Sequence, residues 1–217
     1  MTSRLSLYNG ALLLVGERGL STLTDEVEPR RLLDLAWSTV GGGALDACLG
    51  MGQWKFAKRT VMLSPDPAIS PAFGYGNAFA VPDDFVRTCA LCSDENLGAP
   101  LLDYRTEGDY WYAWVDTIYV SYVSNDATCG GDMSRWPPEF VSVVEAYLAE
   151  KIALKLLEGD AKWKRAKLAL REALRDAKSA DAMEGPPGTL PTSRFVTARQ
   201  GTRGGWSDRG SRNRLIG

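Results

Sequence analysis

Carboxylates are the first residues in this chain that could do chemistry. They come in three close pairs: Asp83 with Asp84, Asp94 with Glu95, and Glu107 with Asp109. Two carboxylates that flank a glycosidic bond can hydrolyse it. All three pairs fall where turns are expected, however, and acidic residues are common in turns. We interpret them as turn residues, and keep as an alternative function a glycan hydrolase that uses acids near 103 to 109, namely Asp103, Glu107 and Asp109.

Histidine is absent from all 217 residues. This absence removes the commonest general base, the commonest metal ligand and every nucleophile pair that depends on histidine. Cys89 and Cys92 have the spacing of half a zinc site, but the other two cysteines, Cys48 and Cys129, form no second pair of this kind. We predict reduced thiols, no metal, no cofactor and no enzymatic activity.

Aromatic residues gather in two places. In "GMGQWKFAKRT", residues 50–60, Trp54 and Phe56 would lie on one side of an extended strand, where they could build a core, stack on a base or hold a partner. The run "YWYAWV", residues 110–115, could be a stacking platform for sugars or nucleic acid. Few basic residues surround the first stretch and none interrupts the second. We interpret the first as core and the second as cross-strand pairs or a subunit contact.

Charge is distributed unevenly along the chain. From Gly185 onward there are six arginines, no lysine and one acid, Asp208, which is a net charge of +5; the rest of the chain carries −7. A few apolar residues, including Val196, are interspersed among the arginines, so we predict an arm that orders when it binds an acidic partner. The predicted arm residues are Arg194, Phe195, Arg199, Arg203, Trp206, Arg209, Arg212, Arg214, Leu215 and Ile216.

The elements that must position these residues are helices at both ends and strands between them. Apolar spacing predicts a helix over 3–15 that ends at Gly16, and a second helix from about Asp25 to Pro29 onward. The stripe of this second helix is Leu32, Leu35, Ala36 and Val40. The glycines at 41–43 predict a kink or a close approach to another backbone, after which residues 44–49 resume the helix. Two long helices follow Pro137 and Asp160, with Gly159 between them. Their predicted apolar stripes are Phe140, Val144, Tyr147, Leu148, Ile152 and Leu156 in the first helix, and Trp163, Ala166, Leu170, Ala173 and Ala177 in the second.

Short β-rich runs separated by turn signals predict one small antiparallel sheet over 84–124, and residues 64–84 read as a long connection without strands. The predicted class is therefore α+β: an antiparallel helical bundle with an inserted small antiparallel β subdomain and an extended C-terminal arm. The predicted boundaries are 1–63 and 136–184 for the helical bundle, 64–135 for the insertion and 185–217 for the arm. A hydrophobic fraction of 45% suits one compact domain, and no apolar run reaches the roughly 18 residues of a membrane span, so we expect no membrane partner.

Several short motifs occur in a fixed order along residues 5–158. They are Trp54, Phe56 and Ala57 in "QWKFA", Pro82, Asp84 and Arg87 in "VPDDFVR", and Trp136 and Pro137 in "WPPEF" before an alanine-rich helix. This order resembles the tail tubular protein A, or head-to-tail adaptor, family of short-tailed bacteriophages. The chain departs from the family pattern at Val81, where leucine is common, at the glycine triplet and in its arginine-bearing arm.

The resemblance implies a structural virion protein that acts in the neck after assembly in the host cytoplasm. About a dozen copies would form a ring beneath the portal protein, extend the DNA channel and join the head to the tail nozzle or tail tube. Duplex DNA would pass through the lumen without specific binding. A third possibility, from a different class, is single-stranded nucleic-acid binding through the arm arginines and Trp206.

Overall fold

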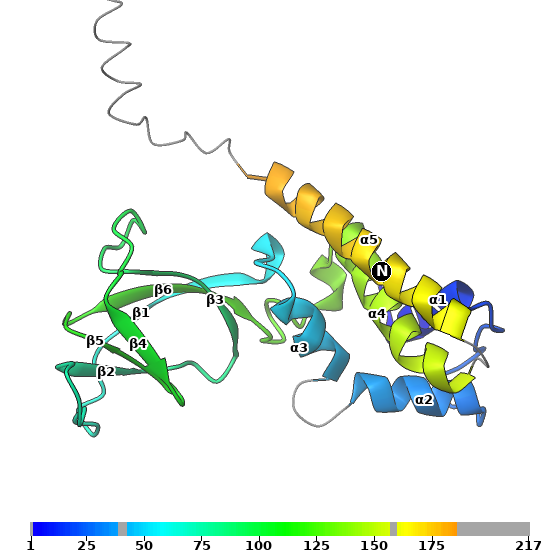
Figure 1. Cartoon of the computed structure of the whole chain (residues 1–217), viewed down its shortest axis with the longest axis horizontal. Helices are drawn as coiled ribbons and strands as arrows, with labels where there is room; N and C mark the ends of the chain where they lie inside the picture. Colours follow the sequence, from blue (N-terminus) through cyan, green and yellow to red (C-terminus); the bar gives the residue numbers. More distant parts are fainter. Residues whose placement is uncertain (1, 39–42, 157–159, 186–217) are drawn as a thin grey trace, which may run out of the picture. The chain divides into compact units, whose positions relative to one another are not determined.

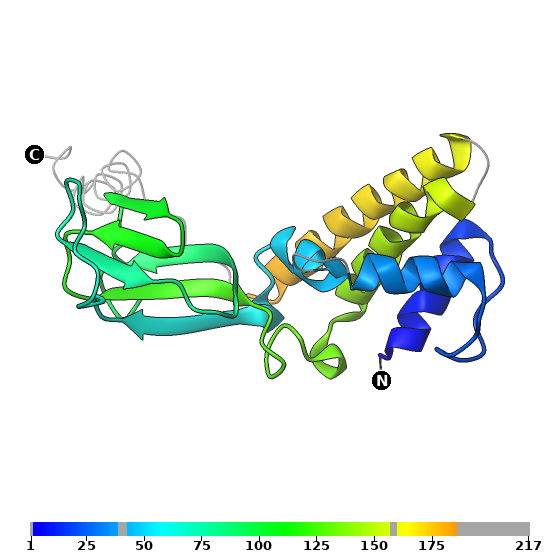
Figure 2. The ribbon, with the colours of Figure 1, turned by 90° about the horizontal axis from the view of Figure 1, so that it is seen from below.

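The computed structural model describes residues 2–38, 43–156 and 160–185, and it combines helices with antiparallel sheets, as the predicted α+β class requires. Its helices and sheets are shown in Figures 1 and 2. The α-helices of the described residues are α1 (Arg4–Val15), α2 (Glu28–Trp37), α3 (Gly43–Gly50), α4 (Pro138–Leu156) and α5 (Asp160–Met183).

The first predicted helix is confirmed, together with its C-terminal glycine. Ser3 caps the N-terminus of α1 by accepting a hydrogen bond from the Ser6 amide, and the Ser6 side chain reaches back to the Ser3 backbone. Gly16 ends the helix in the left-handed conformation, with φ of 85°, and its amide donates to carbonyls of the last turn. Only glycine adopts this conformation at little cost, so the position stops the helix.

The second helix was predicted with the wrong buried stripe. Leu33 is fully buried in α2, whereas Leu35, which we assigned to the core, is 59% exposed. Leu32 and Ala36 pack against the core at half-buried positions, and Val40 lies outside the described residues. Positions two apart on a helix differ by about 200°, so Leu33 and Leu35 lie on opposite flanks of the line through Leu32 and Ala36, and the rotation of the helix about its axis decides which of the two is buried. The partners of α2, not its own spacing, set that rotation.

Gly43 confirms the predicted close approach of two backbones at the glycine triplet. Its φ is 56°, and a Cβ atom there would lie 2.2 Å from the carbonyl oxygen of Trp37. No other residue type can occupy this position without moving the backbone. Gly41 and Gly42 lie outside the described residues.

The long helices α4 and α5 follow their predicted apolar stripes. Phe140, Val144, Leu148 and Ile152 of α4 are all buried, and α1, α2 and α3 each pack against this helix. On α5, Ala166 and Ala177 are buried in the same core, with Trp163 and Leu170 packed beside them. The stripes therefore identify which face of each long helix is covered.

Two three-stranded antiparallel sheets replace the single sheet that we predicted over 84–124. The first has the order β1–β6–β3, with β1 at Lys58–Leu63, β6 at Ile118–Ser124 and β3 at Phe85–Cys92. The second has the order β2–β5–β4, with β2 at Asn77–Ala80, β5 at Tyr110–Ala113 and β4 at Tyr104–Glu107. The prediction was wrong because β1 and β2 lie before residue 84, and β2 falls within the connection expected to lack strands. Pairing between distant segments leaves no local signal.

Strand β6 contributes to both hydrophobic cores through its two faces. Ile118, Val120 and Tyr122 belong to a core built from both sheets, together with Phe79 and Trp111 of the second sheet. Val123 instead belongs to the core that the helices form. Successive side chains of a strand point in opposite directions, so one strand can line both cores.

Candidate functional site

Trp54 is a core residue. Its side chain is 2% exposed, and its indole Nε1 donates a hydrogen bond to the carbonyl oxygen of Cys48 at 3.0 Å. The ring of Phe140 packs edge-on against it, with centroids 5.1 Å apart. A Cβ atom on Gly52 would lie 2.7 Å from the indole, so glycine there leaves room for the ring. This environment confirms the core interpretation of Trp54.

Phe56 and Ala57 complete this aromatic cluster, but not in the predicted extended conformation. Residues Lys55–Ala57 form a short 3₁₀ helix before β1 begins. Phe56 and Trp54 still share a partner, because the Phe56 ring centroid lies 4.8 Å from that of Phe140. Ala57 is fully buried, and a Cβ on Gly130 would lie 3.0 Å from the Ala57 methyl group. The tight turn thus brings both aromatic rings to α4.

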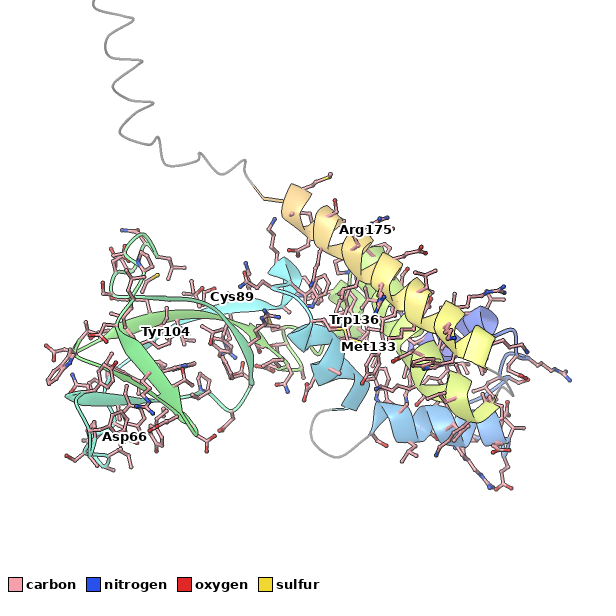
Figure 3. The ribbon with its side chains drawn as sticks, viewed as in Figure 1. Asp66, Cys89, Tyr104, Met133, Trp136 and Arg175 are labelled. Atoms are coloured by element: carbon pink, nitrogen blue, oxygen red, sulfur yellow. The ribbon has the colours of Figure 1, made fainter. Side chains whose placement is uncertain are left out.

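Trp136 approaches the same cluster from the start of α4. Its ring centroid lies 5.1 Å from that of Phe140, and its Nε1 donates to the carbonyl oxygen of Gly130 at 2.8 Å. Pro137 stands just before the helix and its carbonyl accepts the Val141 amide. Helix α4 begins at Pro138, as predicted, because proline fits the first helical turn without losing a hydrogen bond. Figure 3 labels Trp136 beside Met133, which precedes it in a 3₁₀ turn.

Asp84 is the centre of a polar network at the start of β3. Its carboxylate accepts hydrogen bonds from the Tyr122 hydroxyl at 2.9 Å, from the Ser124 hydroxyl, and from the Arg59 guanidinium at 3.0 Å. Arg59 also pairs with Asp126 at 3.1 Å. The Asp84 carbonyl accepts the Asn125 amide at 3.0 Å. This one residue therefore holds the entry to β3 against β1 and β6.

The electrostatics of this network keep Asp84 ionised. Partial burial by itself raises the pKa of the carboxyl, but the hydrogen bonds from Ser124, Tyr122 and Arg59 outweigh it and hold the pKa below the ordinary value. Burial, and then the hydrogen bond to Asp84, raise the pKa of Tyr122 to about 12. A low-pKa acid between an arginine and a protonated phenol is a stable structural arrangement, not a proton donor.

Arg87 connects β3 to the end of α3. Its guanidinium Nη1 donates to the carbonyl oxygen of Gly50, the last residue of α3, at 2.8 Å. Carbonyls in the last turn of a helix lack partners within it and carry partial negative charge, so a cation is favourable there. Pro82 begins the turn that leads into β3, and its carbonyl accepts the Phe85 amide at 3.1 Å. The spacing of Pro82, Asp84 and Arg87 therefore has a structural reason.

The three sequence motifs come together through these contacts. We use the name junction for Trp54, Phe56, Asp84, Arg87 and Trp136 together with the residues that they contact directly. Trp54 contacts α3 and α4, Arg87 binds the end of α3, and Asp84 joins β1, β3 and β6. Asn125, just after β6, also donates to Asp46 of α3 at 3.0 Å. The junction ties the helices to the first sheet.

Sequence reasoning missed four members of the junction. Arg59, Tyr122, Ser124 and Asp126 supply most of the hydrogen bonds around Asp84. The basic run that contains Arg59 was the only available signal, and it did not identify the partner. Asp84 and Asp126 are far apart in the chain, so their shared arginine follows only from strand pairing.

Several of the candidate catalytic carboxylates make structural contacts. Asp94 caps a turn by accepting the Gly98 and Ala99 amides at 3.0 and 2.8 Å, and these bonds lower its pKa. Asp103 accepts the Tyr75 hydroxyl at 2.9 Å, and Glu107 pairs with Arg105 at 2.8 Å. The Asp109 carbonyl accepts the Val81 amide at 2.9 Å. Exposed Asp83 precedes the network of Asp84.

The four cysteines are free thiols. Burial raises the pKa of Cys48 to about 12, and burial likewise raises the pKa of Cys89 and Cys92 on β3. A raised pKa disfavours the thiolate, which is the form that binds metal or attacks. Within residues 2–38, 43–156 and 160–185, no group of three or more cysteines and carboxylates is placed to hold a metal ion.

The aromatic run 110–115 divides between the two faces of the second sheet. Trp111 is buried in the core between the sheets, where its ring packs edge-on against Phe85 at 5.4 Å. Tyr112 faces the other way and packs against Phe73 at 4.9 Å, while Trp114 is 64% exposed beside Tyr75. Part of the run is therefore core and part is exposed, and a subunit contact through the exposed part stays a prediction.

The predicted arm, from Arg194 to Ile216, lies outside the described residues. Among the helices that are described, none is both long and apolar enough to cross a membrane. Compared with known proteins, the chain matches no family model and no curated protein sequence.

Proposed function

We propose that this protein is a head-to-tail adaptor of a short-tailed bacteriophage, a non-catalytic structural protein of the virion neck. In this role its copies form a ring beneath the portal protein, extend the DNA channel and present a second surface to the tail. The proposal starts from the ordered motifs that resemble the tail tubular protein A family.

The observation that carries the proposal is that residues from all three motifs belong to one junction. Motifs that match by chance would be scattered over the fold. Here Trp54 and Trp136 share Phe140, while Asp84 and Arg87 connect strands to α3. The motif residues thus specify how helices and strands are joined, which is what members of one structural family would have in common.

The role of each segment follows from this proposal. The helices of 1–63 and 136–184 would be the bundle that builds the ring, and the inserted segment 64–135 would project toward the tail. The arm 185–217 would gain its structure at assembly, when its arginines meet carboxylates of the portal in charge-assisted, often bidentate contacts. Its interspersed apolar residues would dock at the same time.

The charge of the chain supports passage of DNA without retention. Outside the arm the chain carries a net charge of −7. A channel lined with carboxylates repels phosphates, so duplex DNA can slide through it without being held.

Electron microscopy of the full-length protein mixed with the portal protein of the same virus tests the proposal. We expect a ring that caps one end of the portal. The control is the protein without portal, which establishes what it forms alone. Particles in which the portal is never capped, over a range of concentrations and salt, would contradict the proposal.

A further inference from the structure

Two exposed surfaces of this chain have opposite charge and complementary chemistry. One lies on the second sheet and the other on α5. We propose that they bind each other between two copies of the chain, so that α5 of one copy docks on the second sheet of the next.

The surface on the second sheet is aromatic and acidic. We use the name aromatic face for the residues Phe73, Tyr75, Tyr110, Tyr112 and Trp114. Their rings form a connected set with centroid separations of 4.9 to 6.5 Å. Trp114, which is 64% exposed, lies over Gly76, where a Cβ would approach its ring to 3.1 Å. The face therefore presents Trp114 to solvent beside four half-buried rings, and the glycine at 76 leaves space for the largest ring.

Carboxylates surround this face. Asp103 accepts the Tyr75 hydroxyl at 2.9 Å, Asp66 lies 3.5 Å from the Tyr110 hydroxyl, and Asp116 lies 3.5 Å from the Asn77 amide. Residues 64–117 contain nine acids, two arginines and no lysine, a net charge of −7. Arg87 is directed to Gly50 of α3. Arg105 pairs with Glu107 and lies over the Phe73 ring, so this one arginine offsets only part of the negative charge around the rings. Asp66 is labelled in Figure 3.

The face already accepts a guanidinium from its own chain. The Arg105 Cζ lies 5.2 Å from the centroid of the Phe73 ring, a cation–π arrangement. Strand pairing places Arg105 opposite Tyr112 on this side of the sheet. The chemistry that the face selects is therefore cationic and partly apolar.

The second surface is a stripe along α5. We use the name basic stripe for the residues Lys164, Leu168, Arg171, Arg175 and Lys178. A helix has about 3.6 residues per turn, so these five residues lie on one side of it. All five are exposed, and Leu168 is 53% exposed. The buried residues Ala166 and Ala177 face the opposite way, into the core. Arg175 projects from the helix in Figure 3, and its only ion pair among the described residues is with its neighbour Asp176.

The balance of charge favours a second copy over nucleic acid as the occupant. Helix α5 holds seven basic and four acidic residues, a net charge of +3, opposite in sign to the sheet segment of the same chain. Leu168 in the middle of the stripe gains nothing from a phosphate backbone but can pack on an aromatic ring. Guanidinium groups can lie on the rings while carboxylates at the rim pair with the lysines.

Such a contact joins different surfaces on the two copies. Contacts of this kind repeat from copy to copy, and they close into a ring when the rotation allows it. The inference rests on the proposed function in one respect: the proposed ring needs a contact between neighbouring copies, and this contact would supply it. Individual exposed ion pairs are weak, so assembly should be sensitive to salt and strengthened by closure of the ring.

Crosslinking between copies tests the contact without the portal. A photoreactive phenylalanine replaces Leu168 in an isotopically heavy chain, which is mixed with light chain of the natural sequence. We expect heavy–light crosslinks to peptides that contain Phe73, Tyr75 or Trp114, with a yield that falls as salt rises. The same probe at Leu154, which is 62% exposed on α4, is the control and should not reach these peptides.

Charge reversal then tests the chemistry. One variant carries Arg171→Glu, Arg175→Glu and Lys178→Glu, and another carries Asp66→Lys, Asp103→Lys and Asp116→Lys. Each variant alone should lose the crosslink by about tenfold or more, because like charges then face each other. A mixture of the two variants should recover it, since each contact again joins opposite charges. Glutamine at the same six positions should give an intermediate loss if any reversal variant fails to fold.

Three outcomes would overturn the inference. The crosslinks could stay within one copy, the heavy–light crosslinks could never reach the aromatic face, or the mixture of the two reversal variants could fail to recover the crosslink yield. The protein could instead retain duplex DNA. If the α5 reversal abolishes that retention while the crosslink persists, the basic stripe binds nucleic acid and not a second copy. Because no portal is present, a protein that crosslinks as expected but never caps a portal would contradict the proposed function and leave this contact standing.

Discussion

At the scale of single residues, Trp54 is the largest buried side chain of the junction. Trp54→Ala removes its ring contact with Phe140 and the hydrogen bond to Cys48. We expect it to lower the free energy of unfolding by about 3–5 kcal/mol, as large truncations in cores do. Chemical denaturation measures this change. Trp114→Ala is the matched control, since its ring is 64% exposed and its loss should change stability little. A Trp54→Ala protein of normal stability that fails to assemble would move Trp54 from the core to an interface.

Asp84 makes a prediction about pH. Because its pKa is lowered in the folded protein, the carboxylate contributes stability above the pKa of an unfolded aspartate, and this contribution is lost as the pH falls through the folded pKa. Asp84→Asn should therefore cost roughly 1.5–3 kcal/mol at neutral pH, the usual range for a hydrogen bond to a charged group. The difference in free energy of unfolding between Asp84→Asn and the natural protein should become smaller at acidic pH. Denaturation curves at several pH values measure it, and Asp83→Asn, one position away and exposed, should show no such trend.

Glu145 should show the opposite dependence on pH. This half-buried residue of α4 lies against Gly10 of α1, where a Cβ would come within 2.2 Å of its carboxyl carbon, and burial raises its pKa. A raised folded pKa favours folding below the pKa of an unfolded glutamate, and that advantage is lost as the pH rises through the folded value. Glu145→Gln should therefore stabilise the protein at pH 7 to 8 relative to acid. Glu139→Gln, exposed on the same helix, is the control. Equal effects of both substitutions at all pH values would contradict this assignment.

At the scale of elements, Arg87 joins β3 to the end of α3. Arg87→Ala removes the donor to the Gly50 carbonyl and leaves the helix end without this cation. We expect a cost of about 1 kcal/mol. Hydrogen exchange should increase in α3 before it increases in α4, because the lost contact is local. Arg105→Ala, which breaks a pair in the second sheet, should leave α3 exchange unchanged.

The elements also show where sequence reasoning was sufficient. Helix α1, with Ser3 and Gly16 at its ends, and the stripes of α4 and α5 could be predicted because caps and 3.6-residue spacing are local. The buried side of α2 could not, because packing against α1, α3 and α4 chooses between Leu33 and Leu35. The second sheet was missed because β2 is four residues long and pairs with β5, 30 to 36 positions later.

At the scale of the whole molecule, the proposed arm has a separable role. Deletion of residues 185–217 removes six arginines and keeps every core residue that the structure describes. We expect a folded protein with a nearly unchanged melting temperature that no longer joins portal rings, as electron microscopy would show. Replacement of the six arginines by glutamine should give the same loss, because the charge is what binds. Unimpaired joining by either variant would show that the arm is not needed.

The sequence by itself determined the α+β class, the faces of α4 and α5, the core role of Trp54 and the absence of histidine chemistry. Each of these depends on residue type or on spacing within one element. Only the tertiary structure decided that Asp84 gathers Arg59, Tyr122 and Ser124, and that the rings of Phe73, Tyr75, Tyr110, Tyr112 and Trp114 form one connected face. Those sets join residues from separate strands and loops. Strand register and packing place them together, and neither is written in the spacing of any single segment.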